Sequence, residues 1–336
     1  MITLALDVFG GDNAPAAVID AAAQALRDFS DIRLALCGEK SAIEREITRT
    51  GIDASRVDIS DAPEVIGMDE SPVSAIRVKK NSSIVRAMQL VADKSAQAAI
   101  SAGSTGAILA GATFIVKRLP GVKRPALTPV LPTLGENPVM LIDSGANADC
   151  KPEYLEQFGI MGSAYMENVM KIKNPRVGLL NIGAEAEKGD ELRKAAYPLL
   201  QSVTGINFVG NCEARDLLSG NYDVVVADGF SGNIALKLTE GVAGFMLKTI
   251  KTELMASTVS KLGAALCKPA FKNVKAKLDY SEYGGAILLG VNGGVIKAHG
   301  SSDAHAFYSA IRQAREFVSN GVVEITQTAV ARQLNK

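Results

Sequence analysis

Residues 4–15, LALDVFGGDNAP, place a carboxylate and two adjacent glycines directly after an apolar run. Residues 2–6 are too short and too apolar for an amphipathic helix, so they predict a buried strand, and Asn13 with Pro15 predicts a helix start. Gly10 and Gly11 then lie where the strand becomes a helix. Such a turn suits phosphate or a developing oxyanion, because glycine lets backbone N–H groups approach and the helix N-terminus adds positive charge. Taken alone, the two glycines are better explained as a tight turn without chemical function.

The same design recurs five times later in the chain. Each time a short apolar run ends in a small, polar, glycine-bearing loop, in residues 98–106, 138–147, 176–183, 223–233 and 293–300. The alternation of strands and helices predicts an α/β protein with a mainly parallel sheet in a three-layer α/β/α arrangement. Loops that follow parallel strands lie along one edge of the sheet, where ligands bind. The repetition therefore predicts one binding site built from six loops.

These loops supply the candidate residues for binding phosphate or substrate. They are Asp7, Gly10, Gly11, Asp12, Ser101, Gly103, Ser104, Thr105, Asp143, Asn147 and Ser231. Aspartates at strand ends are as often helix caps as ligands, and no metal ion or other cofactor is predicted. The loops match neither a P-loop nor a dinucleotide fingerprint, and Asn233 stands where a GxSxG hydrolase elbow has its last glycine. Ser231 is therefore expected to be a turn hydroxyl and not a nucleophile.

Histidine is the residue type whose unperturbed pKa lies near neutral pH, and the sequence contains two, His299 and His305. His299 stands at a predicted strand end beside a glycine, which favours it as the acid or hydrogen-bond donor, although a structural histidine fits equally well. His305 is assigned to a helix. Lys188 lies in a loop that opens a helix, where an ammonium group would add charge to a phosphate site. A solvated surface lysine is the alternative.

The composition narrows the possible classes of protein. With 336 residues and 47% hydrophobic content, we expect a single α/β unit over residues 1–330, which can contain two lobes about a crevice. Lys plus Arg and Asp plus Glu both number 36, which argues against nucleic acid as a partner. The four cysteines form no CxxC pair, and no stretch is apolar enough to cross a membrane, so a cytoplasmic protein is expected.

Residues 241–279 depart from this alternation. Apolar residues recur among seven lysines there, which predicts one or two basic amphipathic helices that protrude from the α/β unit. Such a face can lie on anionic lipid, bind a partner or pair with its copy in a dimer. An ordinary core-facing helix is the alternative. The residues predicted to contact a membrane are Leu254, Val259, Leu262 and Leu266.

Six motifs follow one another over nearly the whole chain. They are LDVFGGDNAP, AAISAGSTGA, LIDSGAN, LLNIGAEAEKG, DGFSGNIALK and VIKAHG. In this order they resemble the PlsX-type phosphate acyltransferases of bacterial phospholipid synthesis. Two positions depart from the family pattern, which commonly has Met in place of Phe9 and Asn in place of Ser104. Both departures leave the glycines in place.

The resemblance implies a fold related to phosphotransacetylase and isopropylmalate dehydrogenase, and a homodimer. It also implies reversible transfer of a long-chain acyl group from acyl carrier protein to inorganic phosphate. The acyl phosphate would pass to a membrane glycerol-3-phosphate acyltransferase. For this reason we expect residues 241–279 to make a peripheral contact with the membrane.

In such a reaction phosphate needs positioning against the thioester carbonyl more than it needs a strong base. We expect Lys188 to hold phosphate, and Asn233 or His299 to donate a hydrogen bond to the oxyanion or the departing thiolate. Direct attack by phosphate leaves no covalent acyl-enzyme.

Other functions fit parts of the same pattern. A phosphotransacetylase that uses coenzyme A would share the chemistry and the fold. A β-decarboxylating dehydrogenase fits less well, because it would need a clearer metal cluster and nucleotide contacts. A non-catalytic scaffold for a carrier protein or a membrane would depend on the amphipathic segment alone.

Overall fold

The structure is a computed structural model that describes residues 1–278 and 284–334. Within these residues the larger sheet has seven strands in the order β3-β2-β1-β4-β12-β11-β5, and β11 runs antiparallel to the other six. The strands are β1 (Ile2–Asp7), β2 (Ile32–Gly38), β3 (Val57–Asp61), β4 (Ala98–Ser101), β5 (Ala126–Thr128), β11 (Ala286–Leu289) and β12 (Gly294–Lys297).

Helices cover both faces of this sheet. Leu4 and Leu6 on β1 belong to the core cluster that includes α1 and α11, whereas Ala5 between them belongs to the cluster that includes α4 and α5. Successive residues of a strand point to opposite faces, so the sheet is the middle layer between helices. The helices are α1 (Ala16–Asp28), α2 (Lys40–Thr50), α3 (Pro72–Val78), α4 (Ser83–Ala92), α5 (Thr105–Gly111) and α11 (Ala304–Ser319), with short helical turns at Ala54–Arg56 and Ala112–Val116.

The smaller sheet has five strands among the described residues, in the order β6-β7-β10-β8-β9, of which β6 is antiparallel to the rest. Val224 and Val226 belong to the same core cluster as α6 and as Leu4 of the larger sheet, so the two sheets share one core. The mainly parallel α/β fold expected from the sequence is confirmed. The elements are β6 (Val130–Leu131), β7 (Val139–Ile142), β8 (Arg176–Asn181), β9 (Asn207–Glu213), β10 (Val224–Val226), α6 (Pro152–Asn168), α7 (Glu191–Ser202) and α12 (Val322–Leu334), with a short helical turn at Ala214–Asp216.

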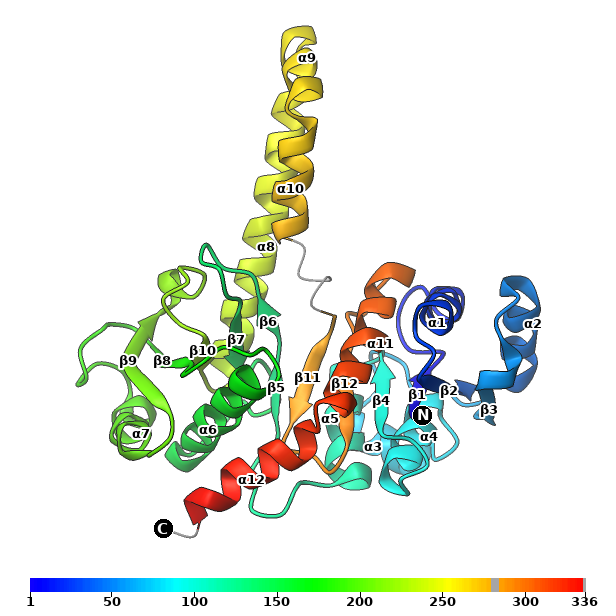
Figure 1. The fold of residues 1–336 in the computed structure, drawn as a ribbon, viewed down its shortest axis with the longest axis horizontal. Helices are drawn as coiled ribbons and strands as arrows, with labels where there is room; N and C mark the ends of the chain where they lie inside the picture. The colour runs from blue at the N-terminus through cyan, green and yellow to red at the C-terminus, as the bar shows by residue number, and fades with distance from the viewer. Residues whose placement is uncertain (279–283, 335–336) are drawn as a thin grey trace.

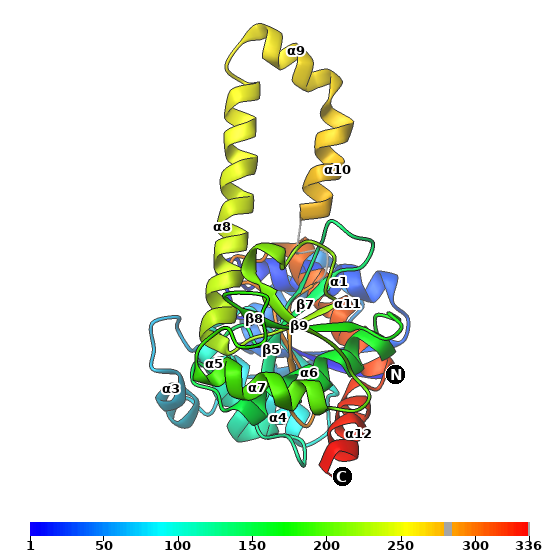
Figure 2. The ribbon, with the colours of Figure 1, turned by 90° about the vertical axis from the view of Figure 1, so that its left-hand side faces the viewer.

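Three helices form an arm that projects from this body. They are α8 (Gly229–Leu254), α9 (Thr258–Leu266) and α10 (Lys268–Leu278). Figure 2 shows α8 and α10 rising as two legs, with α9 across the far end. Helix α8 begins at Gly229, and its first turns, up to Glu240, line a cavity of the body, so the predicted start of the segment at residue 241 lies within a continuous helix. Residue 279, the last of the predicted segment, lies outside the described residues.

The tip of the arm is apolar and exposed. The exposed fractions of Val259, Leu262 and Leu266 are 83%, 67% and 78%, whereas Leu254 at the end of α8 is partly covered. Large apolar side chains normally become buried when they have a partner, so this surface is available for one. Among the described helices, none is both long enough and apolar enough to traverse a bilayer.

Candidate active site

Three glycine-bearing loops of the larger sheet pack against one another. They follow β1, β4 and β12, which are neighbours in the sheet. A Cβ atom on Gly10 would lie 2.8 Å from the backbone N of Gly103, and one on Gly11 would lie 2.9 Å from the carbonyl O of Gly300. The backbone N–H of Asp12, whose side chain is exposed, donates to Gly300 O at 2.8 Å. Because side chains would prevent this approach, the glycines bring the three loops together.

Asp7 and Ser101 are buried where β1 and β4 end. Ser101 Oγ donates to Asp7 Oδ2 at 2.6 Å, and it accepts from the N–H of Gly103 at 3.0 Å. Burial raises the pKa of Asp7, and the hydrogen bond from Ser101 opposes that shift. These hydrogen bonds hold the first residues of the loop after β4, up to Gly103, against the end of β1.

Asp143 orders the loop that follows β7. Its two carboxylate oxygens accept hydrogen bonds from the backbone N–H groups of Leu127, Gly145, Ala146 and Asn147 and from the Asn147 side-chain amide, at 2.7–3.2 Å. Burial raises the pKa of Asp143, and these donors oppose the shift. Asp143 and Asn147 thus hold the loop in shape through contacts with each other.

The loop after β10 opens α8 beside the loop after β7. Asp228 caps the helix, because its carboxylate accepts from two N–H groups of the first turn at 3.0 and 2.9 Å. A Cβ atom on Gly232 would lie 1.9 Å from the carbonyl O of Asp143, so only glycine fits. The Ser231 hydroxyl accepts from Arg193 Nη2 at 2.9 Å. Ser231 is therefore engaged in holding the helix start.

A cavity of about 490 Å³ is lined by loops of both sheets and by the first turns of α8. Its polar side chains come from Thr105, Ser144, Asn233, Lys237, Glu240, Lys297 and His299. Its apolar side chains include Leu109, Leu127, Val130, Leu131 and Leu236. Of the residues predicted from the sequence, the structure thus brings Thr105, Asn233 and His299 to one cavity.

His299 has a defined hydrogen-bond partner at one ring nitrogen. The N–H of Ser301 donates to Nδ1 at 3.3 Å, and Ser301 Oγ lies 2.8 Å from the same atom. A nitrogen that accepts from an N–H carries no proton, so the proton of the neutral ring is assigned to Nε2. Burial lowers the pKa of His299, and Lys237 lowers it further. Near neutral pH the ring is thus a neutral donor through Nε2.

Two cations of the cavity, Lys237 and Lys297, were not among the residues predicted from the sequence. Lys237 Nζ lies 2.8 Å from Glu240 Oε2 on the same face of α8. Lys297 ends β12 and is half-buried, and its ammonium group donates to the carbonyl O of Ala298. Burial lowers the pKa of Lys297 to about 8. The sequence feature that could have indicated Lys297 is its place in the VIKAHG motif, directly before a glycine-bearing loop.

Lys188 and Ser104 lie outside the lining of this cavity. Lys188 is exposed in the loop between β8 and α7, where its carbonyl O accepts from Asn181 Nδ2 at 3.0 Å. Ser104 precedes α5, and its side chain makes no capping hydrogen bond. Neither residue is therefore among those that line the cavity with Asn233 and His299, although Ser104 directly precedes the lining residue Thr105.

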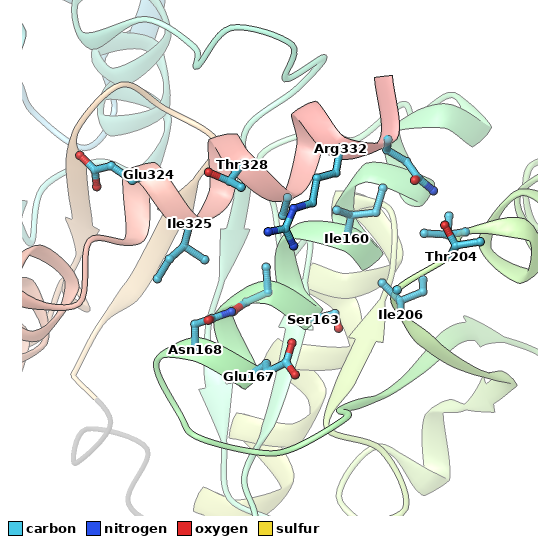
Figure 3. Close-up of a pocket in the computed structure, with 15 residues that line it drawn as sticks. Ile160, Ser163, Glu167, Asn168, Thr204, Ile206, Glu324, Ile325, Thr328 and Arg332 are labelled. Atoms are coloured by element: carbon cyan, nitrogen blue, oxygen red, sulfur yellow. The ribbon is translucent and has the colours of Figure 1, made fainter. Parts of the chain in front are cut away.

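A second cavity, of about 510 Å³, lies between α6, α12 and residues 203–206. Figure 3 shows its charged side chains, Glu167, Glu324 and Arg332, among isoleucines and threonines. In Figure 1, α12 lies at the end of the body opposite the arm. No glycine-bearing loop after a parallel strand contributes to this cavity. The cavity beside α8 is therefore the candidate active site.

This arrangement of two mainly parallel sheets has the fold of the phosphotransacetylase class, as its likeness to solved structures shows. A phosphotransacetylase from Streptococcus pyogenes superposes with a TM-score of 0.64 at 16% identity, covering 96% of this chain and 94% of the other. A branched-chain phosphotransacylase from Enterococcus faecalis V583 gives a TM-score of 0.57 at 11% identity, covering 95% and 99%. At these identities the likeness concerns the fold alone.

The chain belongs to the fatty acid synthesis protein family, whose model matches residues 2–325. A phosphate acyltransferase of Clostridium perfringens (strain ATCC 13124) is 49% identical over 338 residues, which cover 99% of each chain. A phosphate acyltransferase of Clostridium botulinum (strain Loch Maree) is 50% identical over 321 residues, covering 96% of this chain and 95% of the relative. The family resemblance carried by the six motifs is confirmed.

Proposed function

We propose that this protein is a phosphate acyltransferase of lipid synthesis, which transfers a long-chain acyl group reversibly from acyl carrier protein to inorganic phosphate. The observation that carries the proposal is the cavity, where cations and hydrogen-bond donors share one lining with apolar side chains. A fatty acyl thioester has the matching parts, a reactive carbonyl and an apolar chain. The family and the named relatives support phosphate as the acceptor.

In the proposed reaction an oxygen of hydrogen phosphate attacks the thioester carbonyl carbon. The new C–O bond forms while the carbonyl electron pair moves onto oxygen. The C–S bond then breaks, and its electron pair leaves on sulfur. The proton of the phosphoryl group passes to the thiolate, so the products are an acyl phosphate and a thiol. Atoms and charges balance without a cofactor or a covalent acyl-enzyme.

Asn233 and His299 are the proposed donors to the oxyanion. The Asn233 amide and the Nε2–H of His299 both belong to the cavity lining, and neither needs to change protonation state to donate. Fixed donors aimed at developing charge are the largest source of catalysis in many acyl transfers. Apolar neighbours also protect an acyl phosphate from water.

The apolar wall supports a long acyl chain as the donor group. Leu109, Leu127, Val130, Leu131 and Leu236 would bury a chain, and each buried CH₂ contributes roughly 0.8 kcal/mol. The alternative is a phosphotransacetylase that uses acetyl coenzyme A. Competition between a long-chain acyl carrier protein thioester, the matching coenzyme A thioester and acetyl coenzyme A separates the two. A preference for acetyl coenzyme A would favour the alternative.

We further propose that the protein is a cytoplasmic homodimer that associates peripherally with membranes through its arm. The exposed Val259, Leu262 and Leu266 support contact with lipid, and neighbouring exposed lysines suit anionic headgroups. The same lysines suit an acidic acyl carrier protein. At the membrane, a glycerol-3-phosphate acyltransferase would consume the acyl phosphate.

Phosphorus NMR of the purified protein with an acyl carrier protein thioester and inorganic phosphate tests the enzymatic proposal. We expect a new acyl phosphate resonance to appear as the inorganic phosphate resonance decreases. If phosphate is not consumed in a thioester-dependent way, the enzymatic proposal fails. That result would favour a non-catalytic scaffold, in which the arm is the active part.

A further inference from the structure

We infer that Lys297 is the residue that binds inorganic phosphate in the candidate active site. The inference rests on the proposed function, because it assigns the acceptor of that reaction to one side chain. A second basis for the inference is the distribution of charge in the cavity lining. Measuring phosphate binding without turnover tests this basis separately.

The described lining of the cavity contains three side chains of the lysine, arginine, aspartate and glutamate types, Lys237, Glu240 and Lys297. The first two form an ion pair of 2.8 Å, so their charges largely cancel. Among the residues that the structure describes, no carboxylate lies within ion-pair distance of Lys297. Among the described residues of the lining, Lys297 is therefore the cation without a paired carboxylate, and an anion is the ligand that such a charge attracts.

Strand pairing places the backbone of Lys297, and a hydrogen bond from Nζ to the carbonyl O of Ala298 places its ammonium group. Lys297 is the last residue of β12 and pairs in register with Ser101 at the end of β4. Two residues later the chain places His299 in the same lining. An anion bound at Lys297 is therefore held within the cavity that contains the proposed oxyanion donors, which is what direct attack on a carbonyl requires.

Lys188 provides the comparison. Lys188 lies in one glycine-bearing loop and Lys297 directly before another. The side chain of Lys188 is exposed, however, and it does not line the cavity. An exposed ammonium group is screened by water and salt, whereas a half-buried one acts through a lower effective dielectric constant. The half-buried lysine binds an anion more strongly for this reason.

Partial burial also changes the pKa of Lys297. Its pKa is lowered to about 8, first by burial and then by Lys237, while Asp7 and Asp12 act in the opposite direction. A bound phosphate dianion would restore the favourable environment that burial removes. The site thus favours an anion over an empty cavity.

The test measures binding of inorganic phosphate by isothermal titration calorimetry, separately from turnover. Lys297→Met keeps the apolar stem and removes the charge, and Lys297→Arg keeps the charge. We expect Lys297→Met to weaken phosphate binding, and to raise the KM for phosphate, by about tenfold or more, since a hydrogen bond to a charged group is lost. Lys297→Arg should retain most of the affinity. Lys188→Met, the matched control, should bind phosphate as the wild type does.

The outcomes separate this inference from the proposed function. If the wild type transfers acyl groups but Lys297→Met has an unchanged phosphate affinity and KM, the inference is overturned and the function stands. Loss of affinity in Lys188→Met alone would assign phosphate to the other loop. If the wild type binds phosphate through Lys297 but transfers no acyl group, the function fails and the anion site stands. Should Lys297→Met not fold, Lys297→Gln is measured in its place.

Discussion

Nδ1 of His299 lies 2.8 Å from Ser301 Oγ, and the backbone N–H of Ser301 donates to the same nitrogen. This contact leaves Nε2 as the protonated nitrogen of the neutral ring. We expect His299→Ala to lower kcat about 100-fold, the usual effect of losing one oxyanion donor, with little change in the KM for phosphate. Initial rates with an acyl carrier protein thioester measure both constants. Ser301→Ala retains the backbone donor, so it should lose much less activity; equal loss would contradict this role of the ring.

Phosphate affinity is expected to fall as the pH rises through about 8, where Lys297 loses its proton. The titratable groups around it are Lys237 and Glu240 from α8, Asp7 and Asp12 from the β1 end, and His299 two residues later. Only the cationic form attracts the anion, so kcat/KM for phosphate should decrease above that pH.

The control for this pH profile is Lys297→Arg. Guanidinium stays protonated throughout the range, so the variant should show a flat profile where the wild type declines. Ionisation of phosphate itself affects both proteins alike. A decline of the same size in Lys297→Arg would assign the titration to another group.

Asn233→Ala and Lys188→Ala should differ in effect. Asn233 lines the cavity, and its loss removes a proposed oxyanion donor, so we expect kcat to fall about 100-fold. Lys188 is exposed outside the lining, so its loss should change kcat less than tenfold at high phosphate. Steady-state kinetics at saturating phosphate decides the order. If Lys188→Ala is the more damaging, the loop after β8 takes part in the chemistry.

Gly232→Ala should destabilise the protein. The added methyl group would lie 1.9 Å from the carbonyl O of Asp143, so the helix start or the loop after β7 must move, at a cost of about 1–3 kcal/mol. Gly263→Ala in α9 is the matched control. No atom lies within 4 Å of its added methyl group, and alanine favours a helix by roughly 0.5–1 kcal/mol over glycine. Thermal unfolding should show a lower Tm for Gly232→Ala alone.

Leu262→Glu should reduce binding to vesicles of anionic phospholipid. A carboxylate would replace a side chain that is 67% exposed at the tip of the arm. Flotation with Leu262→Met as the apolar control measures the effect, and turnover with soluble substrates should stay near the wild-type value. Vesicle binding that is unchanged in both Leu262→Glu and Leu254→Glu would reject lipid contact by this arm.

The six glycine-bearing loops were predictable because each comes directly after a buried strand, which appears in the sequence as a continuous apolar run. The strands β5, β6 and β11 were not predicted, because each is followed by another strand and so does not show the alternation of strand, loop and helix. The division of the loops between two sheets also depends on contacts between distant segments. Gly10 approaches Gly103, whereas Gly232 approaches Asp143, and no local pattern states either partner.

Residue type and position in a loop led to the prediction of Asn233 and His299, which line the cavity, but not of Lys297. A lysine in a sequence is most often solvated, and what sets Lys297 apart is its register beside Ser101 and its half-buried stem. Lys188 shows the reverse case, because its position in a glycine-bearing loop suggested a ligand while the fold leaves it exposed. Which cation faces a cavity is decided by strand pairing and helix direction.

Helix α8 carries Asn233 in its first turns and Leu254 at its last residue, without a break across its 26 residues. At 1.5 Å per residue it spans about 40 Å. The helix thus joins the exposed tip of the arm to the lining of the candidate active site in one continuous element. In the proposed function a single helix therefore carries both the membrane-facing tip and a donor of the active site, and two natural glycines, Gly241 and Gly244, lie near its midpoint, where they let it bend.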